Sequence, residues 1–243
     1  MLLPIGRAEE RVSVTATIVY SLIILNVLVF LIELAAGDSL ISGYSVVPWE
    51  ITHGEDLVGL VNVRGVGIIP QAPGPVPIYL TLITAMFMHS GWLHIAGNML
   101  YLWIFGGDIE AAFGHLKFLA FYLVCGVAAF FAQIAIDPNS VTPSLGASGA
   151  IAGVLGAYVR MFPLNNIRVL LPLGWLYIPI RLPALVVIGF WIVFQFFDEW
   201  ISITERNAQT LNGGVAYLAH IGGFFVGLAL SFLLRRKEDV KAA

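Results

Sequence analysis

Three groups of polar residues interrupt apolar stretches of the sequence and could carry out chemistry there. They are His89, His94 and Asn98, then Ser148 in a run of small residues, then His220 before a Gly-Gly pair. Strongly polar side chains are costly inside a membrane, so each group is a candidate functional site. A serine hydroxyl beside an imidazole is the nucleophile and general base that serine hydrolysis requires. The sequence therefore predicts a catalytic pair of Ser148 and His220.

Hydrolysis of this kind also requires hydrogen-bond donors for the oxyanion that forms when a carbonyl is attacked. His94 and Asn98 are four residues apart, so on a helix both point the same way, with a ring N–H and an amide N–H to donate. The backbone N–H of Ser148, at a predicted helix N-terminus, is a further donor. No acidic residue is expected at the depth of His220, which predicts a Ser–His dyad and not a triad.

Each of these residues also has an ordinary alternative explanation. Ser148 could cap a helix, His220 could be a buried histidine bonded to a carbonyl, and Asn98 could join two helices. His89, His94 and His220 could bind zinc, but zinc would explain neither Ser148 nor Asn98. We therefore expect no metal and no cofactor. The occurrence of all these residues at one membrane depth favours the hydrolase.

The composition is typical of an integral membrane protein. The 243 residues are 59% hydrophobic and 11% charged, and the mean hydropathy is +0.90. A soluble domain carries about 25% charged residues. The formal net charge is −3 and no strongly basic domain is present, so we expect no nucleic-acid partner. The single cysteine, Cys125, lies in an apolar run and cannot form an internal disulfide.

The sequence predicts an all-α polytopic membrane protein with six transmembrane helices, each of about 20 mostly apolar residues. The predicted spans are residues 15–36, 93–107 with an apolar extension upstream to 81, 118–136, 145–161, 182–197 and 214–234. They form a membrane domain over residues 15–235, between cytoplasmic segments 1–14 and 236–243. A long outer loop covers residues 37–78, and residues 163–180 are expected to be a connector at the membrane surface.

The distribution of basic residues predicts that both termini are cytoplasmic. With the N-terminus inside, ten of the 12 Lys and Arg residues lie on the cytoplasmic side, and only Arg64 and Arg206 lie outside. In this orientation Asn98, Ser148 and His220 all fall in the outer part of the bilayer, on three different helices. They could therefore line one water-accessible pocket.

Two stripes of small residues predict close packing of the fourth and sixth helices. They are Gly149, Gly153 and Gly156 on the fourth helix and Gly223 and Gly227 on the sixth. Such patterns let transmembrane backbones approach closely. Because Ser148 and His220 adjoin these stripes, packing of one stripe on the other would bring the hydroxyl near the imidazole.

Taken together, the motifs resemble those of the rhomboid family of intramembrane serine proteases, of the bacterial and archaeal type with a six-helix core. The matching motifs, in family order, are His89-x4-His94-x3-Asn98, Gly106-Gly107-x2-Glu110, Gly146-Ala147-Ser148-Gly149-Ala150 and Ala219-His220-x2-Gly223-x3-Gly227. The resemblance covers about residues 81–234. It departs from many members at Ala152, where they have an aromatic residue that stacks on the catalytic histidine.

The resemblance implies a serine endopeptidase that cleaves transmembrane segments of single-pass membrane proteins, in contact with lipid in the inner cell membrane. It implies that Ser148 is the nucleophile, His220 the base, and His94 and Asn98 part of the oxyanion hole. Supporting roles are implied for His89 at the mouth of the site, for Glu110 as a hydrogen-bonding group that holds the second helix, and for Gly146, Gly149, Gly153, Gly223 and Gly227.

Substrate entry is expected to be lateral, past the fifth helix and the loop 202–212. The aromatic residues of that helix are expected to face lipid: Phe190, Trp191, Phe194, Phe196 and Phe197. Two other classes of function stay open. One is a channel or transporter lined by histidine and asparagine, although no repeat of the kind common in transporters is found. The other is a non-catalytic protein that binds membrane helices.

Overall fold

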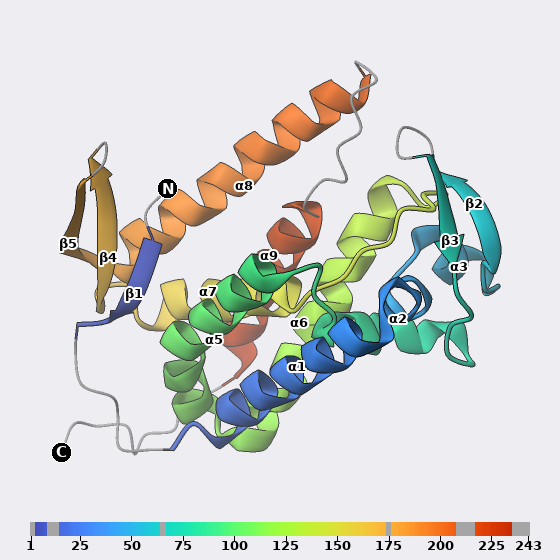
Figure 1. Ribbon diagram of the computed structural model, residues 1–243. Coiled ribbons are helices and arrows are strands. Elements are labelled where there is room, and N and C mark those ends of the chain that lie inside the picture. The colour runs from blue at the N-terminus through green and yellow to red at the C-terminus, as the bar shows by residue number, and fades with distance from the viewer. Residues whose placement is uncertain (1–2, 9–14, 64–66, 174–175, 208–216, 235–243) are drawn as a thin grey trace.

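The computed structural model describes residues 3–8, 15–63, 67–173, 176–207 and 217–234. Most of these residues are helical. The six longest helices of the described part are α1 (Thr17–Ala36), α5 (Trp92–Phe113), α6 (His115–Ile136), α7 (Ser148–Met161), α8 (Ala184–Asn207) and α9 (Tyr217–Leu233). Figure 1 shows α7 among the other helices, with α8 extending away from them.

Two of the described helices, α1 and α6, are long and apolar enough to cross a membrane. A third span is formed if residues 78–87 and α5 are counted together, although these two parts are bent by 80°. Residues 184–197 and 218–233 form shorter apolar helices. The predicted continuation of the second span upstream to residue 81 is therefore wrong as a single straight helix.

The bend before α5 is stabilised by a contact with α1. Residues 78–87 form η1 (Ile78–Leu80), α4 (Thr81–Thr84) and η2 (Ala85–Phe87), and the chain then leaves the helix until Trp92. In this break the backbone N–H of His89 donates to both carboxylate oxygens of Glu33 in α1, at 3.1 and 3.2 Å. A backbone donor that bonds a side chain of another helix is not available to continue its own helix.

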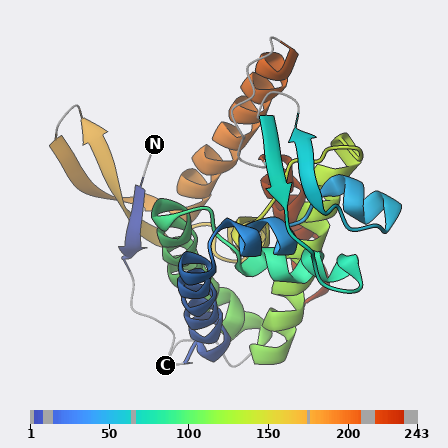
Figure 2. The same cartoon turned by 45° about the vertical axis from the view of Figure 1, so that its right-hand side comes forward.

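The described part is mostly helical, as predicted, but it also contains five strands that the prediction of an all-α protein did not include. One sheet has the order β1-β4-β5 and is built from β1 (Leu3–Arg7), β4 (Asn166–Leu173) and β5 (Leu176–Pro183). The other is the hairpin of β2 (Gly59–Val63) and β3 (Gly67–Gln71). The two sheets lie at opposite ends of the molecule (Figures 1 and 2).

The segment expected to be a surface connector is mostly the antiparallel hairpin of β4 and β5. Ile167 and Val169 of β4 are buried while Arg168 between them is exposed, which is the alternation of a strand with one covered face. Pro179 lies on β5, the edge strand of this sheet, where the missing backbone N–H is tolerated. Pro179 is thus compatible with a hairpin in this segment.

Helix α7 is the centre of the bundle, with ten of its 14 residues buried. It packs most closely on α9. A Cβ added at Gly223 would collide with the carbonyl oxygen of Gly149, and one added at Gly227 would collide with that of Gly153. The two helices are therefore in direct backbone contact, which positions the residues at their N-terminal ends.

The loop predicted to lie outside, residues 37–78, contains α2 (Asp38–Tyr44), α3 (Pro48–His53) and the β2–β3 hairpin. It is joined to the segment that leads into α7 by an antiparallel bridge between Val46 and Ser144, with N–H to O distances of 2.9 and 2.8 Å. The carboxylate of Glu50, in α3, accepts the N–H of Leu57 at 3.0 Å. Burial raises the pKa of Glu50 to about 7.

Candidate active site

Ser148 is the first residue of α7, and the turn before it requires glycine. Gly146 has a φ of +122°, and its N–H donates to the carbonyl of Ala85 at 2.8 Å. A Cβ at this position would lie 2.9 Å from the His94 ring and 3.6 Å from the Ser148 hydroxyl. The backbone at Gly146 thus holds Ser148 next to His94.

The Ser148 hydroxyl is hydrogen-bonded to His220 of α9, with 2.7 Å between Oγ and Nε2. The N-cap residue of α7 is Ala147, and Ser148 is the first residue within the helix. The capping alternative is therefore not what the structure shows. The geometry is that of a hydroxyl which can transfer its proton to an imidazole.

The other nitrogen of the His220 ring is bonded to Gln195 of α8, with 2.6 Å between Nδ1 and Oε1. The ring of Trp191, one helical turn before Gln195, lies 5.8 Å from the His220 ring at an interplanar angle of 39°. Both residues are absent from the sequence-based site. Their signal was present, because Gln195 is a polar residue in an apolar helix and Trp191 is four residues earlier.

Trp191 is expected from the sequence to face lipid, but the structure places its ring beside His220. The four phenylalanines expected on the same wall are exposed, by 54% for Phe190, 43% for Phe194, 49% for Phe196 and 60% for Phe197. The helix also continues further than predicted, to Asn207. The first part of the expected gate loop, residues 202–207, is thus helical, and residues 208–212 lie outside the described part.

Asn98 and His94, the predicted oxyanion donors, lie on one face of α5. Asn98 is buried, and its amide Nδ2 has no hydrogen-bond partner among the described residues. His94 Nδ1 lies 3.1 Å from the Ser90 hydroxyl, and the other side of its ring lies against Gly146. The His94 ring is thus oriented toward the turn that holds Ser148.

The ring of His89 packs against the ring of His94. The two rings meet edge to face, with centroids 5.1 Å apart and an interplanar angle of 66°. His89 is buried, and its backbone is held by the carboxylate of Glu33. Glu33 is a further residue that the sequence-based site did not include, since nothing in its spacing links α1 to the break before α5.

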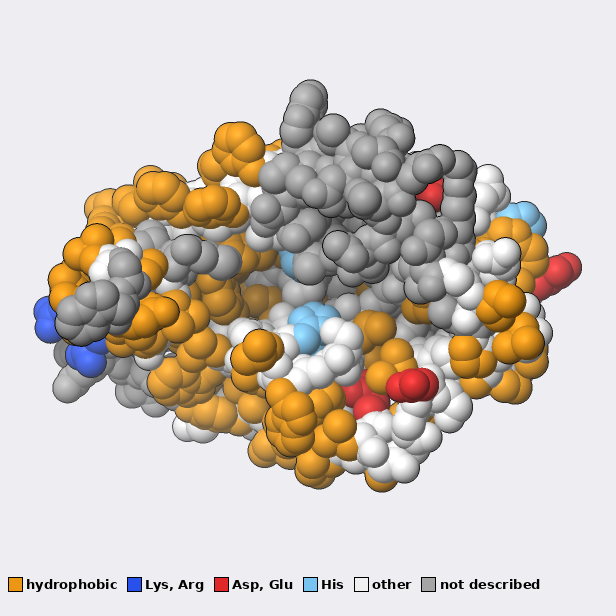
Figure 3. Space-filling model, turned by 45° about the horizontal axis from the view of Figure 1, so that its top comes forward, with side chains coloured by type: hydrophobic (Ala, Val, Ile, Leu, Met, Phe, Trp, Pro, Cys, Tyr) orange, Lys and Arg blue, Asp and Glu red, His pale blue; other side chains and the backbone are white. Residues whose placement is uncertain are grey.

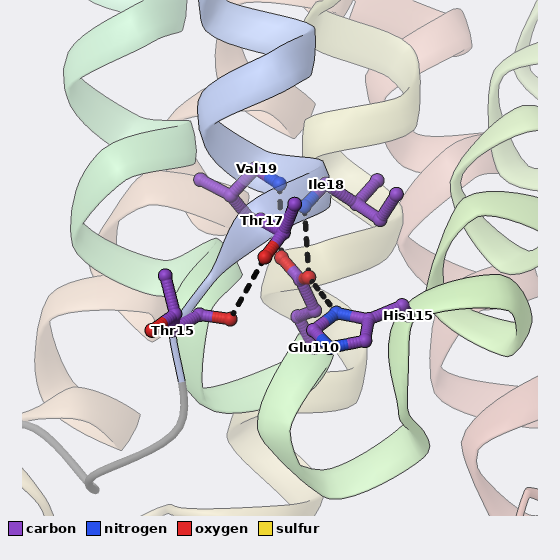
Figure 4. Close-up of polar contacts among 6 residues, drawn as sticks. All are labelled: Thr15, Thr17, Ile18, Val19, Glu110 and His115. Atoms are coloured by element: carbon purple, nitrogen blue, oxygen red, sulfur yellow. Dashed lines mark hydrogen bonds and ion pairs between the residues drawn. The ribbon is translucent and has the colours of Figure 1, made fainter.

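Glu110 connects the ends of three helices (Figure 4). Glu110 lies in the last turns of α5. Its carboxylate accepts hydrogen bonds from the N–H groups of Ile18 and Val19 at the start of α1, at 2.8 and 2.9 Å. The same carboxylate is hydrogen-bonded to Nδ1 of His115 at the start of α6, at 2.5 Å. The first N–H groups of a helix have no partner within it. Glu110 satisfies two of them and so fixes α1 against α5.

A small cavity adjoins the Ser148 hydroxyl. Most of its lining is small residues, and two larger apolar side chains, Phe130 and Leu145, complete it. The small residues are Gly126, Ala129, Ser144, Gly146, Ser148, Gly149 and Ala219. Figure 3 shows histidine side chains near the middle of one face of the molecule, between hydrophobic side chains. Polar groups thus reach the surface among apolar side chains on this face.

Comparison with known proteins gives one consistent result. The family profile of the Rhomboid domain matches residues 78–237, which include α5, α6, α7, α8 and α9. "Rhomboid-like protein 11, chloroplastic" of Arabidopsis thaliana is 28% identical over 176 residues, which is 68% of this chain and 58% of that protein.

Two further relatives come from a fungus and a bacterium. "Rhomboid protein 1, mitochondrial" of Saccharomyces cerevisiae is 29% identical over 66% of this chain and 43% of its own length. "Rhomboid protease GluP" of Bacillus subtilis is 33% identical over 61% of this chain and 25% of its own length. The chain thus matches about a quarter to three fifths of the length of these relatives.

The profile match extends over more than half of the chain and includes Ser148, His220, His94 and Asn98. The relatives named for the same family come from plants, a fungus and a bacterium. The chain is a membrane protein that belongs to the rhomboid family.

Proposed function

We propose that this chain is an intramembrane serine endopeptidase that cleaves transmembrane segments of membrane proteins. The observation that supports this most directly is the 2.7 Å hydrogen bond between Ser148 Oγ and His220 Nε2. In the first step Ser148 Oγ bonds to the substrate carbonyl carbon while its proton passes to His220 Nε2. The C–N bond then breaks, and the leaving amine takes that proton. Water, deprotonated by His220, hydrolyses the acyl ester and restores Ser148.

The proposed oxyanion hole consists of Asn98, His94 and the backbone N–H of Ser148. Within the described residues the Nδ2 of Asn98 has no hydrogen-bond partner. This supports the assignment, because a negatively charged oxygen would supply an acceptor. The backbone N–H of Ser148 lies at the N-terminus of α7, where the helix dipole favours negative charge.

The proposed substrates are single-pass membrane proteins whose helix unwinds near the cut, since a helical backbone shields its carbonyls. Small residues are expected next to the scissile bond, because the cavity beside Ser148 is small and is bounded by Phe130 and Leu145 as well as by glycine and alanine. The exposed phenylalanines of α8 support lateral entry from lipid. We further propose six membrane-crossing helices, cytoplasmic termini and a location in the inner cell membrane, on the basis of the distribution of Lys and Arg.

The proposal is tested by replacing the two reacting groups. Ser148→Ala and His220→Ala should each abolish cleavage of a reporter transmembrane substrate in proteoliposomes, because removal of nucleophile or base stops the reaction. Matched controls are Ser39→Ala and His53→Ala, which change an exposed serine and an exposed histidine of the outer loop. Both controls should cleave normally.

A fluorophosphonate probe gives a second, independent measurement. It should label the unchanged protein at Ser148 and should not label Ser148→Ala. Full cleavage by Ser148→Ala or His220→Ala contradicts the proposed dyad. A folded protein that neither cleaves nor reacts with the probe is instead the non-catalytic binder of membrane helices.

A further inference from the structure

We infer that Gln195, assisted by Trp191, positions His220 as the base, so that the dyad is completed by a neutral amide from α8. This inference rests on the proposed proteolytic function. Gln195 is 6% exposed and His220 is 8% exposed, so their 2.6 Å hydrogen bond lies inside the protein. This hydrogen bond pairs the buried Oε1 of Gln195 with the buried Nδ1 of His220.

The direction of the hydrogen bond sets the tautomer of His220. Gln195 presents its carbonyl oxygen, which can only accept, so Nδ1 of the imidazole carries the proton. In a neutral ring the other nitrogen, Nε2, then has a free lone pair. This is the nitrogen that lies 2.7 Å from the Ser148 hydroxyl. Gln195 therefore holds the ring in the form that can take up the serine proton.

A neutral amide suits this position better than a carboxylate would. Residues 184–197 of α8 are apolar enough to lie in a membrane, and a carboxylate among them would carry a charge that is costly to desolvate. The amide supplies the acceptor without a buried charge. This explains how a ring-orienting group can be present although no acidic residue was expected at this depth.

Trp191 holds the ring from the same helix. It lies one turn before Gln195, and its indole packs near the imidazole at 5.8 Å between centroids. On α7, the position four residues after Ser148 is Ala152, which has no aromatic ring to pack on His220. The aromatic contact with His220 therefore comes from α8. Displacement of α8 from α9 would remove both the hydrogen bond and the aromatic contact.

The test compares substitutions at two glutamines. Gln195→Leu should lower kcat for a transmembrane reporter about 10- to 100-fold with KM unchanged, because the base loses its orientation while substrate contacts remain. Gln195→Glu, which keeps the acceptor and its reach, should retain most of the kcat but lower the thermal unfolding midpoint, because its carboxylate is costly to desolvate. The matched control is Gln133→Leu in α6, where Oε1 has no hydrogen-bond partner in the described structure. It should leave kcat unchanged.

A second variant separates positioning from folding. Gln195→Asn keeps the amide but shortens its reach by one methylene, so it should lose kcat like Gln195→Leu while the thermal unfolding midpoint stays near that of the unchanged protein. If Gln195→Asn and Gln195→Leu both keep full kcat while Ser148→Ala is inactive, this inference is overturned and the proposed protease stands. If Ser148→Ala itself is active, the proposed function is wrong.

Discussion

Asn98 is a residue of this site that has a buried hydrogen-bond donor without an acceptor in the described structure. Its Nδ2 has no hydrogen-bond partner among the described residues although the side chain is buried. A buried donor without an acceptor destabilises a protein by about 1–3 kcal/mol. An oxyanion formed at Ser148 would provide that acceptor only as the reaction proceeds, which is the condition for catalysis by transition-state binding.

Asn98→Ala should therefore lower kcat about 10²- to 10³-fold, the usual effect of removing one oxyanion donor. The thermal unfolding midpoint should not fall, because the lost group forms no hydrogen bond through Nδ2 in the described structure. Steady-state cleavage of the reporter and a melting curve measure the two effects. Asn26→Ala, which changes a buried asparagine of α1, is the control with normal kcat expected. Unchanged kcat in Asn98→Ala would remove Asn98 from the oxyanion hole.

At the scale of elements, the site depends on the contact between α7 and α9. Ser148 and His220 lie near the N-terminal ends of these helices, and the glycines that follow them allow the two backbones to touch. Because the helices are rigid, their separation sets the distance between hydroxyl and imidazole. The contact between α8 and α9 adds Gln195 to the same ring.

Gly227→Ala tests this dependence. The added methyl group would meet the backbone of Gly153, which cannot move without separating α7 from α9. Overpacking of this kind costs about 1–3 kcal/mol, so both the thermal unfolding midpoint and the cleavage rate should fall. Gly189→Ala in α8 is the matched control, because a Cβ there meets nothing within 4 Å. A Gly227→Ala protein with normal stability and rate would show that the helices need not touch.

At the scale of the whole molecule, long-range polar contacts join the N-terminal strand β1 to the bundle. β1 pairs with β4, and Arg7 forms an ion pair with Asp108 of α5. Asp108 also accepts the hydroxyl of Tyr158 in α7, at 2.8 Å. The β1-β4-β5 sheet is thus fixed to the bundle at the end that the charge distribution assigns to the cytoplasm.

The proposed membrane orientation, with the β1-β4-β5 sheet on the cytoplasmic side, can be tested with single cysteine substitutions. The native Cys125 is buried, so it gives little background labelling. A membrane-impermeant maleimide applied to intact cells should label Glu55→Cys, in the exposed outer loop, and should not label Arg181→Cys, on exposed β5, until the membrane is opened. Labelling of Arg181→Cys in intact cells would reverse the proposed orientation.

Much of this architecture could be predicted because it is encoded locally. Apolar runs located the long helices, and the glycine stripes together with the polar motifs predicted that Ser148 and His220 would be neighbours, which is where the structure places them. Hydropathy alone could not identify the hairpin of β4 and β5, because a short apolar segment with prolines fits a connector as well as an edge strand. It also could not identify the bend at His89, which depends on Glu33 of another helix.

The sequence by itself determined that this chain enters a membrane and carries a serine, two histidines and an asparagine in the order of the rhomboid motifs, since composition and motif spacing are properties of neighbouring residues. Only the tertiary structure decided what holds His220. Gln195 lies 25 positions away, and its contact depends on how α8 is rotated and seated against α9. Side-chain packing between helices sets that geometry, and no local pattern in the sequence specifies it.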